Sequence, residues 1–66
     1  MTGKDAAIAV LKGEGVLLRT GNRVIYRSHR GRVLTWRCRN VATAVVTLAV
    51  FQELARRQTA REQEAV

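Results

Sequence analysis

The sequence predicts a small α+β domain with the order helix, three antiparallel strands, helix, in which a three-stranded meander packs on a long C-terminal helix. Three observations predict it. Both ends of the chain are rich in good helix formers, and the middle holds short runs rich in β-branched residues. Glycine-containing turns separate these runs. The length of 66 residues fits a single domain, residues 1–66.

The first helix is expected over residues 3–12. Thr2 is placed to cap its N-terminus, and Asp5 lies in the first turn, where a negative charge is favourable. Gly13 is placed to end the helix in the left-handed conformation. A helix this short is not stable alone, so it must pack on the rest of the chain.

Three strands are expected over residues 16–20, 23–28 and 32–39. Gly21 and Asn22 form a two-residue hairpin loop between the first two strands, since both residue types tolerate positive φ. His29, Arg30 and Gly31 fit a three-residue second loop with glycine at the left-handed position.

The length of the second loop decides which side chains share a face of the sheet. A three-residue loop places apolar side chains on the face toward the long helix, and these are Leu17, Val24, Tyr26, Leu34, Trp36 and Cys38. The opposite face then collects Arg23, Arg27, Arg37 and Arg39 among aliphatic residues and threonines. A two-residue loop would turn the third strand over and place arginines among the core aromatics, at a cost in desolvation. The three-residue loop is therefore favoured.

The long helix is expected from Val41 to about Gln58, with Asn40 as its N-cap and residues 60–66 frayed. Its wheel carries two apolar stripes. The first suits the sheet and comprises Val41, Ala44, Val45, Leu48, Phe51 and Ala55. The second lies roughly opposite and comprises Ala42, Val46, Val50 and Leu54.

The second stripe needs a cover. The first helix, through Ala7, Ile8 and Leu11, and an identical subunit are two alternatives that the sequence leaves open. The second alternative predicts a homodimer with Val46, Val50 and Leu54 at its interface. A dimer would also present twice the basic surface to an extended polyanion.

The positive charge is concentrated in one segment. Between Arg19 and Arg39 the chain has no acidic residue and seven arginines, namely Arg19, Arg23, Arg27, Arg30, Arg32, Arg37 and Arg39. Elsewhere basic and acidic residues balance, so this segment carries the whole net charge of +7. Such a local positive field selects anionic partners.

Guanidinium groups bind phosphates bidentately and keep their charge at all physiological pH values. The seven arginines therefore predict a small, non-enzymatic accessory protein of phage or mobile-element type that binds DNA or RNA through the sheet face and hairpin. The alternative is a protein that docks on another protein, as an inhibitor or adaptor of a nucleic-acid-processing complex, for example a phage-encoded anti-CRISPR-like blocker. A third interpretation is a subunit ordered by its partner through the second stripe.

The element order is similar to that of the double-stranded-RNA-binding domain. The tight hairpins depart from that family, and only Arg37 and Arg39 approach the basic cluster that the family carries at the start of its second helix. The similarity is one of topology, and no binding residue is carried over from it.

Other classes of function have no support in the sequence. His29 has no acid nearby to orient it as a base, and Cys38 with His29 falls short of the four ligands of a structural zinc site. No catalytic residue, cofactor or metal is expected. The longest apolar run, from Val41 to Phe51, is too short for a membrane span, and we expect a cytoplasmic protein without a secretory signal.

Overall fold

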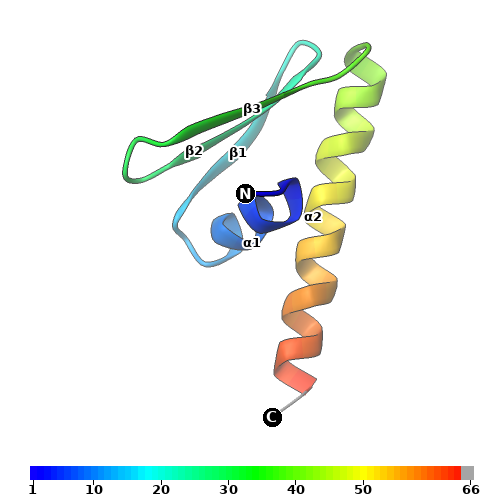
Figure 1. Cartoon of the computed structure of the whole chain (residues 1–66). Coiled ribbons are helices and arrows are strands. Elements are labelled where there is room, and N and C mark those ends of the chain that lie inside the picture. Colours follow the sequence, from blue (N-terminus) through cyan, green and yellow to red (C-terminus); the bar gives the residue numbers. More distant parts are fainter. Residues whose placement is uncertain (65–66) are drawn as a thin grey trace.

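The computed structural model describes residues 1–64 and confirms the predicted order of elements (Figure 1). The elements are α1 (Gly3–Leu11), β1 (Gly15–Thr20), β2 (Arg23–Ser28), β3 (Val33–Arg37) and α2 (Val41–Glu64). The strands form one antiparallel sheet in the order β1-β2-β3. Within the described part of the chain, neither helix is both long enough and apolar enough to cross a bilayer.

Both ends of α1 are closed by the predicted residues. Thr2 and Asp5 form a capping box, in which the Thr2 hydroxyl accepts the Asp5 N–H at 3.2 Å and the Asp5 carboxylate accepts the Thr2 N–H at 3.2 Å. These hydrogen bonds from Thr2 lower the pKa of Asp5 from its ordinary value of 3.8. Gly13 ends the helix at φ +76°, and the Glu14 N–H donates to the Ala9 carbonyl at 2.9 Å.

The two hairpin loops have the predicted lengths. Gly21 has φ +61° and Asn22 stays outside the positive-φ region, as in a type II′ turn with glycine first. In the second loop the Ser28 N–H donates to the Arg32 carbonyl at 2.8 Å, and Gly31 has φ +86°. The three-residue loop is therefore confirmed, and with it the register of β3.

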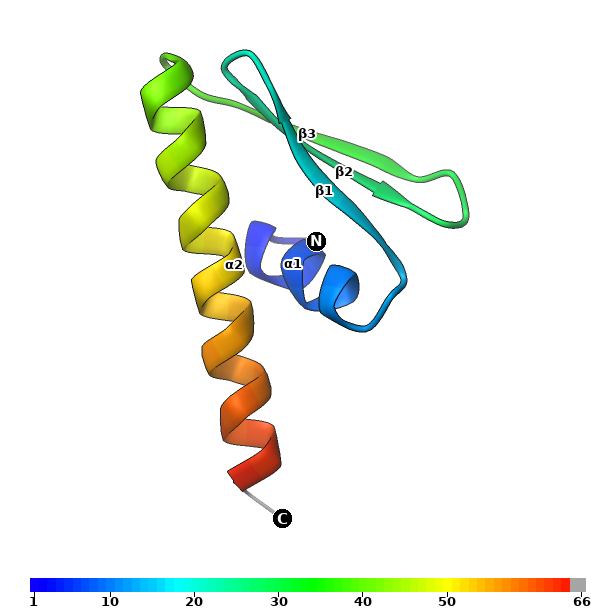
Figure 2. The same ribbon diagram turned by 180° about the vertical axis from the view of Figure 1, so that it is seen from behind.

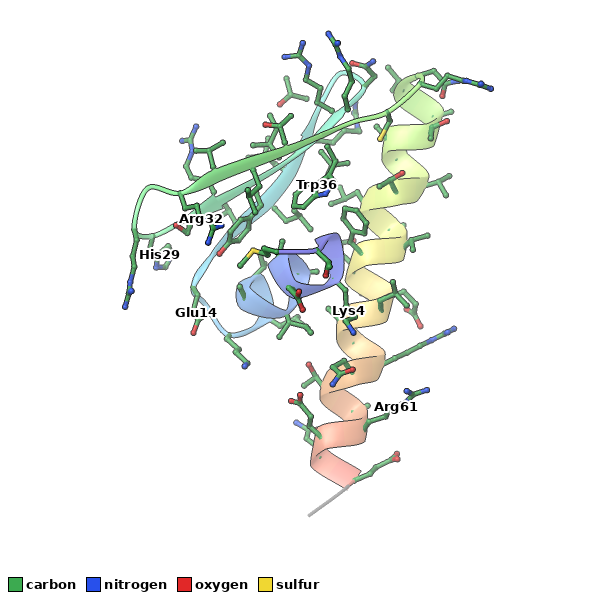
Figure 3. All side chains as sticks on the ribbon, viewed as in Figure 1. Lys4, Glu14, His29, Arg32, Trp36 and Arg61 are labelled. Carbon is green, nitrogen blue, oxygen red and sulfur yellow. The ribbon has the colours of Figure 1, made fainter. Side chains whose placement is uncertain are left out.

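The sheet has one covered face, which we call the inner face, and one open face, the outer face. In both views α1 lies in the angle between the inner face and α2 (Figures 1 and 2). Ala6 and Ala9 of α1 pack on Tyr26, with Leu17 and Leu34 around them. The predicted packing of α2 on the sheet occurs at Trp36, which meets Phe51 edge to face at a centroid distance of 5.4 Å (Figure 3).

The core is thin. Among the described residues, Val24 is the largest side chain with under 2% exposure, and five of the seven buried apolar residues are alanines, namely Ala6, Ala7, Ala9, Ala44 and Ala55. The radius of gyration is 12.1 Å, whereas a compact domain of this length has about 11 Å. A small core of this kind gives a marginal monomer, which a partner would stabilise.

The inward face of α2 is narrower than the wheel predicts. Ala44 and Ala55 are buried and Phe51 is half-buried, but Val41 and Val45 are 50% and 49% exposed. The prediction that both valines pack on the sheet is wrong. In this part of α2 the inward side is formed instead by Ala44, Thr47 and Leu48, and the Thr47 hydroxyl accepts a hydrogen bond from the Cys38 thiol at 3.7 Å.

The second stripe of α2 is not covered by α1. Instead, α1 packs near Phe51, whose ring fills the space that a Cβ on Gly3 would need. Val46, Val50 and Leu54 are 61%, 46% and 40% exposed. Cover of this stripe within the chain is therefore incomplete, and each of the three side chains keeps 40% or more of its surface exposed.

Helix α2 is longer than predicted. It was expected to end near Gln58, yet it continues to Glu64. A side-chain hydrogen bond one turn apart supports the extension, since Glu62 accepts from Gln58 at 3.4 Å. Residues 59–64 thus belong to the helix, and residues 65 and 66, which were also expected to fray, lie outside the described residues.

Gly15 offers a stability test of the sheet. A Cβ at this position would lie 2.6 Å from the Arg27 carbonyl oxygen and 2.8 Å from the Tyr26 ring. Since one obstacle is backbone, we expect Gly15→Ala to lower the free energy of unfolding by about 1–3 kcal/mol. Urea unfolding checks this, with Thr20→Ala at the exposed end of the same strand as a control. Equal stability of Gly15→Ala and the wild type would contradict the close approach of β1 and β2.

Candidate nucleic-acid interface

The side chains of the outer face form three rows, each made of one residue from each strand. Along every strand these residues alternate with residues of the inner face. The pairing of the strands gives the rows Thr20–Arg23–Arg37, Leu18–Ile25–Thr35 and Val16–Arg27–Val33. Both helices lie on the other side of the sheet, so this face is open (Figures 1 and 2). Three of the seven predicted arginines therefore share one surface with aliphatic and threonine side chains between them.

These three arginines are exposed and have no acidic partner. Within residues 1–64 the ion pairs join Glu53 to Arg56 at 2.9 Å and to Arg57 at 3.2 Å, both on α2. The same two guanidinium groups lower the pKa of Glu53 through hydrogen bonds and charge. The basic residues of α2 are thus partly neutralised locally, whereas those of the outer face are not.

Arg23 and Arg37 are directly opposite each other on neighbouring strands. Like charges in this position destabilise a sheet by a few tenths of a kcal/mol up to about 1 kcal/mol. A phosphate between the two guanidinium groups would remove this repulsion and accept hydrogen bonds from both. The paired arginines are therefore the strongest anion-binding feature of the outer face.

The other four arginines are distributed around this surface or away from it. Arg39 is exposed in the connection after β3, and Arg30 is exposed in the β2–β3 loop. Arg19 pairs with Val24 and so belongs to an inner-face row, and its Nη1 donates to the Gly21 carbonyl at 2.8 Å. Arg32 is expected from its loop position to extend the outer face, but the structure places it on the inner side.

Arg32 lies there in a hollow of about 490 Å³ at the β2–β3 hairpin. The walls also include Tyr26, Ser28 and Glu14, none of which the sequence indicates as a site residue. Figure 3 shows Glu14, His29 and Arg32 at this end of the molecule. Strand alternation is the signal that would have placed Arg32 here, because Arg32 has the same parity as the inner residue Leu34.

Cys38 and His29 are the two residues whose side chains could act in catalysis or bind a metal, but the contacts of both residues are structural. Cys38 is half-buried, and its thiol donates to the Thr47 hydroxyl of α2 at 3.7 Å. The backbone N–H of His29 donates to the Glu14 carbonyl at 3.0 Å, and its side chain is exposed. No group of three or more metal-ligating side chains occurs among residues 1–64.

The predicted interface residues Val46, Val50 and Leu54 lie along the side of α2 that is turned away from the packed core. The described stretch from Asn40 to Gln52 contains no charged residue, so the exposed side of the first half of α2 is uncharged and largely apolar. Figure 3 shows Arg61 in the charged second half of the same helix, beyond α1.

No protein-family model matches this chain, and neither a curated protein nor a solved structure matches it at a significant level. No family is assigned. The outer face, the hollow and the apolar side of α2 are thus the features from which a function must be inferred.

Proposed function

We propose that this chain is a small, non-enzymatic accessory protein, of phage or mobile-element type, that binds duplex DNA through the outer face of its sheet. The supporting observation is the open surface that carries Arg23, Arg27 and Arg37 without any carboxylate partner among the described residues. Guanidinium groups in this setting favour phosphate oxygens.

The spacing of the arginines fits the two phosphate backbones that border a major groove. Arg23 and Arg27 are four residues apart on β2, which at the strand rise corresponds to about 13 Å. The major groove of B-DNA is about 12 Å wide and admits a two-stranded ribbon. With the strands across the groove, arginines at both ends reach phosphates, and the row Leu18–Ile25–Thr35 faces the base edges.

This geometry favours DNA over duplex RNA. The major groove of A-form RNA is deep and narrow, and side chains cannot read it. The row between the arginines supplies aliphatic side chains for thymine methyl groups and one hydroxyl for hydrogen bonds. Arg39, which is exposed in the connection after β3, extends the contact beyond the end of that strand.

A titration of the purified chain against labelled duplex DNA, duplex RNA and single strands tests the proposal. We expect the tightest binding to duplex DNA, at micromolar or lower concentration and with a steep dependence on salt. A preference for single strands would contradict groove binding.

We further propose that the chain acts as a homodimer through Val46, Val50 and Leu54. The exposure of these side chains and the thin core support this proposal, because a second copy would bury apolar surface that the monomer leaves in water. Two outer faces in one particle would raise the affinity for DNA through effective concentration.

The same apolar side of α2 favours a second candidate function, that of an inhibitor or adaptor, anti-CRISPR-like in character, that docks on another protein of a nucleic-acid-processing complex. Exposed apolar side chains on one side of a helix are typical of a protein-binding site. The oligomeric state and DNA binding together distinguish the DNA-binding function from the docking function. A chain that is monomeric and binds no DNA fits only the docking function.

A further inference from the structure

The hollow at the β2–β3 hairpin lies on the opposite side of the sheet from the proposed DNA-binding surface. Its volume of about 490 Å³ falls within the range of small-ligand sites. The residues that matter for its chemistry come from the hairpin, from β2 and from the α1–β1 turn, and they are Glu14, Tyr26, Ser28, His29, Arg30 and Arg32.

Tyr26 contributes a free hydrogen-bond donor to this hollow. The residue is only 2% exposed, and a buried tyrosine hydroxyl usually has a partner. None of the side-chain hydrogen bonds in residues 1–64 involves Tyr26, and no fully buried side-chain oxygen or nitrogen in this range lacks a partner. The hydroxyl must therefore reach the surface of the hollow that Tyr26 lines.

The charged groups of the hollow favour an anion. Two of the lining residues, Arg30 and Arg32, carry guanidinium groups, His29 carries an imidazole that can add a further donor, and Glu14 carries the one opposing carboxylate. None of these four takes part in an ion pair within the described residues. The balance of fixed charge is thus positive.

The walls of the hollow are connected by hydrogen bonds. The His29 N–H donates to the Glu14 carbonyl at 3.0 Å, which ties the hairpin to the α1–β1 turn. The Arg32 N–H donates to the Ser28 hydroxyl at 2.9 Å, which fixes the loop beside Tyr26. A site held in this way needs little rearrangement to receive a ligand.

We propose that the hollow binds a phosphate monoester. Arg30 and Arg32 donate to its oxygens, and the Tyr26 hydroxyl donates from the base of the hollow. Glu14 opposes a free anion but accepts a hydrogen bond from a hydroxyl of the attached sugar, so an ester binds better than inorganic phosphate. The ester is either the terminal phosphate of a nucleic-acid strand or a free nucleotide. Binding of a strand end rests on the proposed DNA-binding function, whereas binding of a free nucleotide does not.

The test is an NMR titration of the isotope-labelled full chain at constant ionic strength. The probes are inorganic phosphate, adenosine 5′-monophosphate and adenosine. We expect saturable shifts at Tyr26, His29 and Arg32 with the nucleotide, weaker binding of inorganic phosphate, and no shifts with adenosine. Equal shifts with adenosine, or no saturable shift with the nucleotide, would overturn the proposal.

Two variants and a control make the test specific. Tyr26→Phe and Arg32→Gln are each expected to weaken nucleotide binding about tenfold, because each removes a hydrogen bond to a charged group. Arg37→Gln removes the same charge from the outer face and is expected to change affinity less than about twofold. A loss at Arg37→Gln as large as at Arg32→Gln would show that only net charge matters and would refute the site.

Duplex DNA with either 5′-phosphate or 5′-hydroxyl ends distinguishes the two possible ligands, a strand end and a free nucleotide. Tighter binding to phosphorylated ends that disappears in Arg32→Gln identifies a strand end as the ligand. Equal binding of the duplexes with 5′-phosphate and 5′-hydroxyl ends would identify a free nucleotide as the ligand, provided that the NMR titration shows nucleotide binding. A chain that binds the nucleotide but no duplex would contradict the proposed function and leave the hollow site standing.

Discussion

Replacement of Arg23, Arg27 and Arg37 with glutamate is expected to weaken duplex DNA binding by at least about 100-fold. The three side chains are exposed on one face, and Arg23 and Arg37 are paired across strands. Their reversal removes three phosphate contacts and places three carboxylates against the DNA backbone. Fluorescence anisotropy with a labelled duplex measures the change, and circular dichroism checks that the variant is folded.

The matched control reverses Arg56, Arg57 and Arg61, which changes the net charge by the same amount on α2. Two of these pair with Glu53 at the surface, and exposed pairs of this kind contribute only about 0–1 kcal/mol to stability. We expect the control to lose less than about tenfold in affinity. An equal loss in both variants would mean that binding reflects total charge and not the outer face.

Replacement of Val50 with glutamate is expected to convert the dimer to a monomer, with the dimer dissociation constant rising by about 100-fold or more. Val50 is 46% exposed in the single chain and would be buried in the proposed two-fold contact. A charge without a partner is unfavourable there. Sedimentation equilibrium at high micromolar concentration measures the change.

Val41→Glu is the matched control, because Val41 is also a half-exposed valine of α2, at 50%. Nine residues separate the two positions, which places them on opposite sides of the helix. We expect Val41→Glu to remain dimeric. A wild-type chain that sediments as a monomer under these conditions would contradict the dimer and favour a docking partner for the same side of α2.

Loss of the dimer should also lower DNA affinity. Two linked surfaces gain up to about 10²–10⁴-fold over one through effective concentration. We therefore expect Val50→Glu to bind DNA at least about tenfold more weakly, although it leaves the outer face intact. Unchanged DNA affinity would show that a single outer face is sufficient.

Local rules in the sequence predict the sheet and its faces correctly. Gly31 and the three-residue loop determine the register of β3, and strand alternation then separates Arg23, Arg27 and Arg37 from the inner-face residues Val24, Tyr26 and Trp36. The caps at Thr2 and Asn40 follow from residue type in the same way, since Asn40 accepts the Thr43 N–H at 2.8 Å. Each of these features depends on residues close together in the chain.

Features that depend on how elements pack are not predicted. Val41 and Val45 are exposed because the inward side of the first turns of α2 is formed by Ala44, Thr47 and Leu48, and the helical periodicity of the sequence does not distinguish between these sides. The position of Arg32 in the hollow follows from the contact between the hairpin and the α1–β1 turn, through His29 and Glu14. Charge alone groups the seven arginines, whereas strand alternation, applied also to Arg19 and Arg32, divides them between the two sides of the sheet.

The most direct test of the central claim is the salt dependence of duplex DNA binding by the wild-type chain. With Arg23, Arg27, Arg37 and neighbouring arginines on phosphates, the slope of log K against log salt should be about −3 to −5 per chain, and replacement of these three by glutamine should reduce it by about 3. No binding at low salt, or a slope near zero, would contradict the account.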